Sequence, residues 1–169
     1  TVELMTPKGI LLSLQLEEIK QEESAVICGV RKDGGDDPDT TNGLLIFARV
    51  EKCQKPGIQL DGGVGVGRVT RPGLSQEIGE AAINPVPKAM ILKVAEEVCQ
   101  EYDYEGGLKV TIFVPDGEET AKKTFNPRLG ILGGISILGT SGIVEPMSEA
   151  ALIERIRVEI MAQIISESI

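Results

Sequence analysis

The chain has 169 residues, a length at which one domain buries a substantial hydrophobic core. Its formal net charge is -9, and it contains three phenylalanines, two tyrosines and no tryptophan. A nucleic-acid interface needs concentrated basic side chains and rings for stacking, so the composition argues against a nucleic-acid partner. The chain has no histidine, which excludes histidine-based nucleophile systems and histidine-ligated metal sites within these residues.

Cysteine usage and hydropathy indicate the compartment. Cys28, Cys53 and Cys99 are odd in number and show no C-x-x-C spacing. We therefore expect buried thiols in a reducing cytoplasm and no protein metal site. No stretch approaches about eighteen consecutive apolar residues, so we expect no membrane partner.

The first half of the chain predicts strands. Residues 10–16 are mostly apolar, residues 25–30 are rich in β-branched side chains, and residues 44–50 alternate around Ile46 and Ala48. Residues 55–87 are dense in glycine and proline. We interpret this segment as a long functional loop.

Helical spacing begins after Pro87 and is stopped by Gly106 and Gly107. The apolar positions of this helix are Ile91, Val94, Ala95, Val98 and Tyr102. A strand is predicted at residues 108–114, a short helical stretch at 118–124, and a final amphipathic helix capped by Ser148. This order predicts an α+β fold with a mixed sheet covered by helices in two layers and with long glycine-rich functional loops.

Residues 32–43 form an acidic loop with four aspartates. An EF-hand beginning at Asp33 needs glycine and glutamate where this sequence has Pro38 and Leu44, so a calcium loop is excluded. Two interpretations remain. The loop is either a solvated acidic turn, or it holds basic neighbours or the ribose or sulfonium of a cofactor.

Residues 62–73 contain five glycines and two arginines. Arg68 and Val69 stand where a phosphate-binding loop needs lysine and a hydroxyl residue, and Thr70 replaces the third glycine of a dinucleotide fingerprint. Neither nucleotide motif is complete. Arg68 and Arg71 still suit bidentate contacts to carboxylates, whereas a loop with solvated arginines is the alternative.

A second glycine-dense region follows Asn126 and Arg128. Its glycines indicate unusual dihedral angles, close approach to a ligand, or tight backbone packing. Glu145, between this region and the final helix, is the most plausible single carboxylate for a site.

Four strings together resemble the CbiD family, the cobalt-precorrin-5B C(1)-methyltransferases. They are KDGGDDPDTTNG at residues 32–43, DGGVGVGRVTRPG at 61–73, EAAINPVPK at 80–88 and the long run VPDGEETAKKTFNPRLGILGGISILGTSGIVEPMSEAAL at 114–152. The family carries an N-terminal motif before Thr1 and a C-terminal region after Ile169. The resemblance therefore implies that residues 1–169 are the main α+β domain of a longer protein.

The resemblance implies methyl transfer from S-adenosyl-L-methionine to C-1 of cobalt-precorrin-5B, giving cobalt-precorrin-6A in anaerobic cobalamin biosynthesis. S-adenosyl-L-methionine would be the co-substrate, the corrinoid would be the small-molecule partner, and cobalt would arrive only within that substrate. The residues that we expect to bind the cofactor are Asp36, Asp37, Gly133, Gly134 and Glu145. Those expected to bind the substrate are Arg68, Arg71, Asn126 and Arg128; no catalytic residue is assigned.

Two alternatives remain open. A kinase-like enzyme that handles phosphate through residues 62–73 would bind nucleotide with magnesium. A non-catalytic tetrapyrrole-binding module would bind the corrinoid without methyl transfer.

Overall fold

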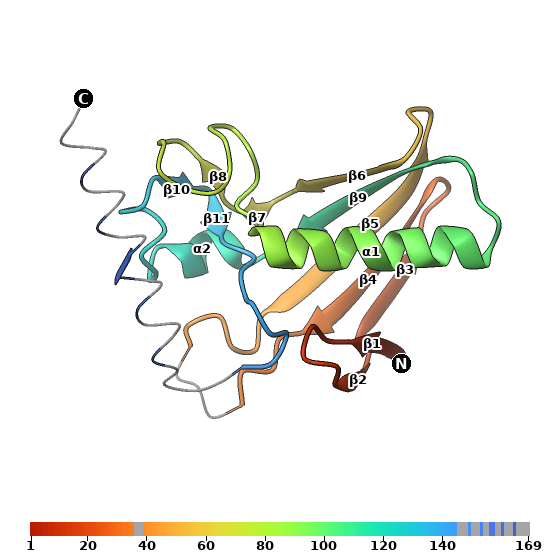
Figure 1. Ribbon diagram of the computed structural model, residues 1–169, viewed down its shortest axis with the longest axis horizontal. Helices are drawn as coiled ribbons and strands as arrows, with labels where there is room; N and C mark the ends of the chain where they lie inside the picture. Colours follow the sequence, from red (N-terminus) through yellow and green to blue (C-terminus); the bar gives the residue numbers. More distant parts are fainter. Residues whose placement is uncertain are drawn as a thin grey trace.

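The computed structural model describes residues 1–35 and 39–144, and beyond them only positions 149, 153, 156, 157, 160 and 164. Its centre is a five-stranded sheet in the order β3-β4-β5-β9-β6 (Figure 1). The strands are β3 (Glu18–Gln21), β4 (Ala25–Arg31), β5 (Leu45–Cys53), β6 (Ile58–Gly62) and β9 (Gly107–Phe113). β6 pairs with β9 in parallel and the other pairs are antiparallel. The predicted mixed sheet is confirmed.

The two faces of this sheet differ because side chains alternate along each strand. Val110 and Ile112 of β9 are buried on one face, where the partly buried Ile46 and Ala48 of β5 pack beside them. The opposite face combines the stacked rings of Phe47 and Phe113, whose centroids lie 5.0 Å apart, with a group of ion pairs. There Glu51 accepts contacts from Arg49 at 2.5 Å and from Lys109 at 3.4 Å.

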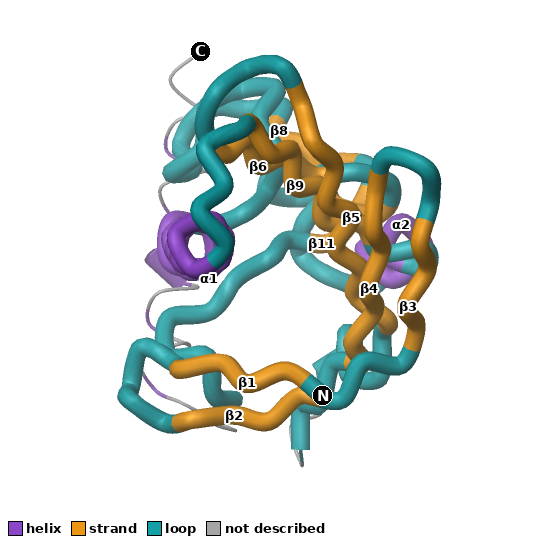
Figure 2. Tube along the Cα trace, turned by 90° about the vertical axis from the view of Figure 1, so that its right-hand side faces the viewer, coloured by secondary structure: helices purple, strands orange, loops and turns teal. Residues whose placement is uncertain are grey.

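Helix α1 (Pro85–Glu101) lies along the apolar face of the sheet, so that helix and sheet form two layers (Figures 1 and 2). Pro85 fits the first helical position because its missing N–H needs no partner there. Ile91 packs against the core, whereas Val94 and Val98 are 39% and 48% exposed. The predicted apolar stripe is therefore only partly buried by the described residues.

The expectation of a long loop at residues 55–87 is wrong. This segment contains β6 and two short strands, β7 (Gly65–Val66) and β8 (Arg68–Val69), and it leads into α1. β7 pairs in parallel with β11 (Gly134–Ile135), and β8 pairs antiparallel with β10 (Ile131–Leu132). The two glycine-rich regions of the sequence therefore form one structural unit.

Helix α2 (Gly117–Ala121) contacts β7 and β11 at the end of the sheet. A separate hairpin of β1 (Val2–Met5) and β2 (Leu11–Leu14) lies beside α1 (Figure 2). After β11 the chain runs toward this hairpin, and Gly142 reaches Thr6 (Figure 1). Within the described residues, no helix is long and apolar enough to cross a membrane.

Two further expectations concern the thiols and the final helix. Cys28, Cys53 and Cys99 are free thiols but half-buried rather than fully buried. The expected cap of the final helix, Ser148, lies outside the described residues.

Candidate functional site

The two glycine-rich segments meet backbone to backbone. A Cβ built on Gly134 would lie 2.2 Å from the carbonyl oxygen of Gly65, and one built on Gly117 would lie 2.1 Å from the same atom. Real Cβ atoms do not approach backbone this closely, so glycine at both positions is a packing requirement. Gly65 also has φ of 74°, in the left-handed region that favours glycine. Of the interpretations left open above, tight packing accounts for Gly134.

Gly133 differs from its neighbour. It is exposed, it has φ of 80°, and a Cβ there would meet nothing within 4 Å. The position therefore leaves its backbone open to a ligand, and its expected cofactor contact stays a prediction.

Asn126 is buried, and its side chain forms hydrogen bonds within this glycine-rich unit. Its Nδ2 donates to the carbonyl of Gly134 at 3.0 Å, and its Oδ1 accepts from the Ser136 hydroxyl at 3.2 Å. The side chain thus has a structural role in holding β11. A substrate contact by Asn126 stays a prediction.

Arg71 and Arg128 flank the β8–β10 pair. Thr70 donates to the carbonyl of Gly130 through both its amide and its hydroxyl, at 2.8 and 2.7 Å, and the stem of Arg71 lies over Gly130. The Arg128 guanidinium lies 5.5 Å from the centre of the Phe125 ring. Both arginines are exposed. Neither forms an ion pair with a carboxylate in the described part of the chain, so both guanidinium groups remain available for an anion.

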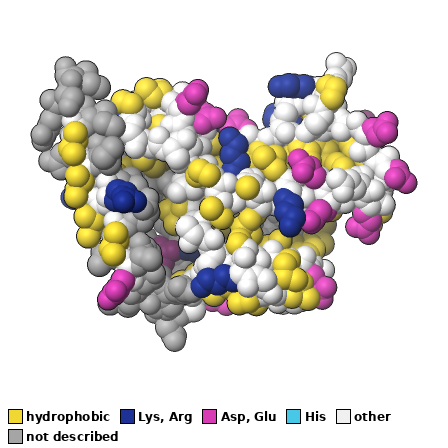
Figure 3. Space-filling view, in the orientation of Figure 1, with side chains coloured by type: hydrophobic (Ala, Val, Ile, Leu, Met, Phe, Trp, Pro, Cys, Tyr) yellow, Lys and Arg dark blue, Asp and Glu magenta, His cyan; other side chains and the backbone are white. Residues whose placement is uncertain are grey.

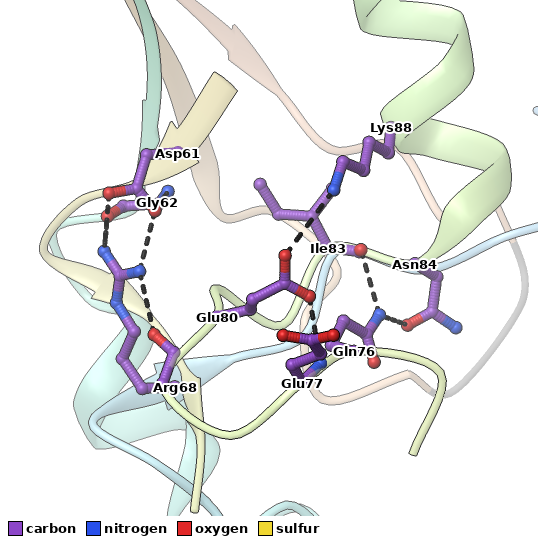
Figure 4. A network of polar contacts seen from close by, with 10 residues as sticks. Asp61, Gly62, Arg68, Gln76, Glu77, Glu80, Ile83, Asn84 and Lys88 are labelled. Carbon is purple, nitrogen blue, oxygen red and sulfur yellow. Dashed lines mark hydrogen bonds and ion pairs between the residues drawn. The ribbon is translucent and has the colours of Figure 1, made fainter. Parts of the chain in front are cut away.

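The Arg68 guanidinium is already paired with a carboxylate, that of Asp61. Its guanidinium donates to both carboxylate oxygens of Asp61, at 2.7 and 3.0 Å, and to the carbonyl of Gly62 at 2.6 Å (Figure 4). The hydrogen bonds from Arg68 lower the pKa of Asp61, although burial partly opposes them. The pKa of Arg68 is raised in turn. The structure therefore does not bring the three predicted arginines into one cluster.

Arg68 and Asp61 line one side of a pocket of about 250 Å³ between β6, β8 and the start of α1. Glu80 and Lys88 line the same pocket, with Lys88 Nζ 3.9 Å from Glu80 Oε1. Apolar walls come from Leu60 and other side chains: Ile78, Ala81 and Ile83. The pocket is thus lined by two basic and two acidic groups.

The loop that lines this pocket is held to the two residues before α1. Gln76 donates through Nε2 to the carbonyl of Ile83 at 2.9 Å and to Oδ1 of Asn84 at 3.1 Å (Figure 4). Asn84 is the residue before the helix, and its side chain makes no capping bond within α1. Its amide oxygen is therefore used to hold the pocket loop.

Of the four charged residues in this pocket, only Arg68 is predicted from the sequence as a site residue. Asp61, Glu80 and Lys88 lie in the strings that carry the family resemblance, but they belong to no recognised binding motif. A signal was present in the opposite charges that flank the glycine loop and the start of the helix.

The acidic loop contains a local ion pair. Lys32 Nζ contacts the carboxylate of Asp39 and lies 2.5 Å from the Thr41 hydroxyl oxygen. Burial raises the pKa of Asp39, but the hydrogen bonds from Lys32 and Thr41 outweigh it and the pKa is lowered. This part of the loop holds a basic neighbour, one of the two functions expected for it. Asp36, Asp37 and Glu145 lie outside the described residues, and their cofactor roles stay predictions.

A larger apolar groove of about 640 Å³ lies between the β1–β2 hairpin and α1. Val94 and Met90 line it, together with the carboxylates of Glu3, Glu97 and Glu101 and the ammonium of Lys93. Three carboxylates against one lysine make this groove a poor match for a polyanionic ligand. On the visible face of Figure 3, the described basic and acidic side chains are likewise interspersed among hydrophobic ones.

The phosphate-loop alternative also finds no geometric support in the described residues. The segment after Gly62 enters β7 and β8 and then a turn, not a helix whose N-terminus could face a phosphate. The fold and site together define an α+β domain that joins two glycine-rich segments beside a small pocket of mixed charge.

Comparison with known proteins gives the family. The model of the CbiD family matches residues 1–146, and the chain belongs to that family. A cobalt-precorrin-5B C(1)-methyltransferase of Ruminiclostridium cellulolyticum is 61% identical over 94% of this chain and 41% of its own length. The protein of that name from a Thermoanaerobacter species is 56% identical over 95% of this chain and 43% of its own length.

A solved structure agrees in fold. The crystal structure of a cobalamin biosynthesis protein (cbiD) from Archaeoglobus fulgidus superposes with a TM-score of 0.62 at 34% identity, covering 93% of this chain and 49% of that one. The chain spans about two fifths of the length of the curated relatives it matches.

Proposed function

We propose that this chain is part of an enzyme that transfers a methyl group from S-adenosyl-L-methionine to C-1 of cobalt-precorrin-5B in cobalamin biosynthesis. The observation that carries the proposal is the 61% identity to a relative of that name along nearly the whole chain. The proposal concerns the whole enzyme, because the chain spans only about two fifths of such relatives.

The chemistry suits a chain without histidine. The sulfonium of the donor is an activated leaving group, and an electron-rich ring carbon is the nucleophile. The sulfur–methyl bond breaks as the carbon–carbon bond forms, and S-adenosylhomocysteine leaves. The protein has mainly to align donor and acceptor, a contribution that reaches about 7–11 kcal/mol in well-oriented systems. No protein nucleophile is required.

The exposed arginines supply the proposed corrinoid contacts. The ring substrate carries peripheral carboxylates, and a guanidinium binds a carboxylate through two parallel hydrogen bonds. Arg71 and Arg128 are exposed and lack carboxylate partners among the described residues. Arg68 is a weaker candidate for this role because Asp61 already neutralises its charge. The exposed backbone at Gly133 lies between β10 and β11, one short strand on from Arg128.

We further propose that the enzyme works in the cytoplasm. Cys28, Cys53 and Cys99 are free thiols, as is usual in a reducing compartment.

Transfer of labelled methyl from S-adenosyl-L-methionine to cobalt-precorrin-5B tests the proposed activity. The chain should be assayed within the full-length protein, with the corrinoid product analysed by mass. A mass gain at the ring with release of S-adenosylhomocysteine would support the proposal. Corrinoid binding without methyl transfer would favour the non-catalytic module, and magnesium-dependent nucleotide binding would favour the kinase-like alternative.

A further inference from the structure

The pocket between β6, β8 and α1 carries balanced opposite charges beside apolar side chains. Asp61 and Glu80 contribute two negative charges, and Arg68 and Lys88 contribute two positive ones. Each of the four side chains is between 41% and 50% exposed, so water and ligands reach them. A polyanion would meet two carboxylates in this pocket. A ligand that carries one charge of each sign would meet a partner for both.

The two ion pairs differ in strength. Arg68 holds Asp61 through two hydrogen bonds and is fixed further by the carbonyl of Gly62. Lys88 lies 3.9 Å from Glu80, beyond hydrogen-bond distance, and its ammonium donates no hydrogen bond within the described residues. An exposed pair of this kind contributes little to the stability of the fold. A ligand can therefore separate it at little cost.

Glu80 is held in place without Lys88. Its Oε2 accepts from the amide of Glu77 at 2.9 Å, which leaves Oε1 directed toward Lys88 across the pocket (Figure 4). The opening between these two groups has an anionic side and a cationic side. Leu60, Ile78 and Ile83 provide apolar walls next to it.

We propose that this pocket binds the α-amino-acid end of the methyl donor, an inference that rests on the proposed function. The ligand carboxylate accepts from Lys88 Nζ, and the ligand ammonium donates to Glu80 Oε1. Every charge keeps a partner in this exchange. The methylene chain of the donor packs on the apolar walls, and Arg68 and Asp61 maintain the shape of the opposite side.

The size of the pocket fits this fragment. Small-molecule pockets for whole ligands are usually about 300–1,000 Å³, and this one is about 250 Å³. It lies below the usual range for pockets that enclose a whole ligand. It matches one end of the donor, with the nucleoside end extending out of the pocket.

Calorimetric titration of the full-length protein that contains this chain tests the inference with three probes: S-adenosylhomocysteine, methylthioadenosine, which lacks the amino-acid group, and free methionine. The variants are Lys88→Met and Glu80→Gln. Lys93→Met is the matched control, since Lys93 lies on the same helix in an exposed ion pair with Glu97 at 3.6 Å. Unfolding curves of each variant verify that the fold is intact.

We expect Lys88→Met and Glu80→Gln each to raise the Kd for S-adenosylhomocysteine about tenfold or more, as for a lost charged hydrogen bond. Methylthioadenosine affinity should not change in either variant, and Lys93→Met should bind every probe like the parent chain. If the parent and both variants bind S-adenosylhomocysteine with equal affinity, the donor's amino-acid end does not bind in this pocket. That result would not contradict the proposed use of the methyl donor.

A different set of binding results would contradict the proposed methyl transfer. If S-adenosylhomocysteine does not bind but methionine binds in a manner that depends on Lys88, the pocket holds an amino acid and the methyl-donor function is wrong for this chain. If neither probe binds the parent chain, the pocket assignment is overturned.

Discussion

Gly134 of β11 lies against Gly65 of β7, so closely that a methyl group on Gly134 would stand 2.2 Å from the Gly65 carbonyl carbon. The contact joins segments that are distant in the sequence, and the atoms that would clash belong to backbone. A flexible side chain could move aside, but these strands cannot.

Gly134→Ala should therefore lower the free energy of unfolding by about 3 kcal/mol or more, the upper range for overpacking. Gly133→Asn is the control, because that position is open and asparagine tolerates positive φ. The control should lose about 1 kcal/mol or less. Urea unfolding of both variants measures the difference, and similar losses at the two positions would contradict the packing account.

Arg71 and Arg128 are expected to act on ligand binding rather than on folding. Arg71→Met keeps the apolar stem that covers Gly130, and Arg128→Met removes the charge beside Phe125. Each change should raise the Kd for a cobalt corrinoid with free carboxylates about tenfold or more. The free energy of unfolding should change by about 0.5 kcal/mol or less.

Arg31→Met is the control for loss of an exposed arginine, since Arg31 pairs with Glu17 at the end of β4. Fluorescence quenching by the corrinoid gives the Kd for all three variants. Loss of stability with unchanged corrinoid affinity would show that Arg71 or Arg128 is structural.

How much of this fold the sequence predicts depends on how local each signal is. Strand β4 was predicted because Val26, Ile27 and Val30 give a local β pattern. β6 was missed because Pro56 and Gly57 precede it and a glycine-rich run follows it. β7 and β8 have two residues each and exist through pairing with distant partners. No pattern within such a short window identifies them.

The same distinction applies to the site. Glycine density and the arginines were visible in the sequence, but packing and ligand access predict the same glycines. Only the three-dimensional contacts separate Gly134, which packs, from Gly133, which is open. The approach of Lys88 to Glu80 likewise needs the three-dimensional contacts, because the sequence shows only that opposite charges flank the start of the helix.

Asn126 provides a test of the unit that holds β11. Asn126→Ala removes the donor to the Gly134 carbonyl and the acceptor for Ser136, and it leaves buried polar groups without partners. The free energy of unfolding should fall by about 1–3 kcal/mol. Ser136→Ala removes only one of these bonds and should cost less. Thermal and urea unfolding give both values, and equal stability of Asn126→Ala and the parent chain would contradict the structural role.

The Asp61–Arg68 pair should make stability depend on pH. The hydrogen bonds from Arg68 lower the folded-state pKa of Asp61 below its unfolded value of about 3.9. The unfolded state therefore binds the proton more readily. The stabilisation is complete above the unfolded pKa and is lost as the pH falls through the folded pKa.

Asp61→Asn should consequently lower the free energy of unfolding at pH 7 by about 1 kcal/mol or less, because the pair is half exposed. The difference from the parent chain should shrink once the pH falls below the unfolded pKa of about 3.9, and it should vanish below the lowered folded-state pKa, where the aspartic acid is protonated in both states. Glu96→Gln, on the exposed side of α1, controls for removal of one negative charge. Urea unfolding at pH 7, 5 and 3 measures the difference directly. A difference that stays constant down to the lowest pH would show that the carboxylate charge of Asp61 does not stabilise the fold.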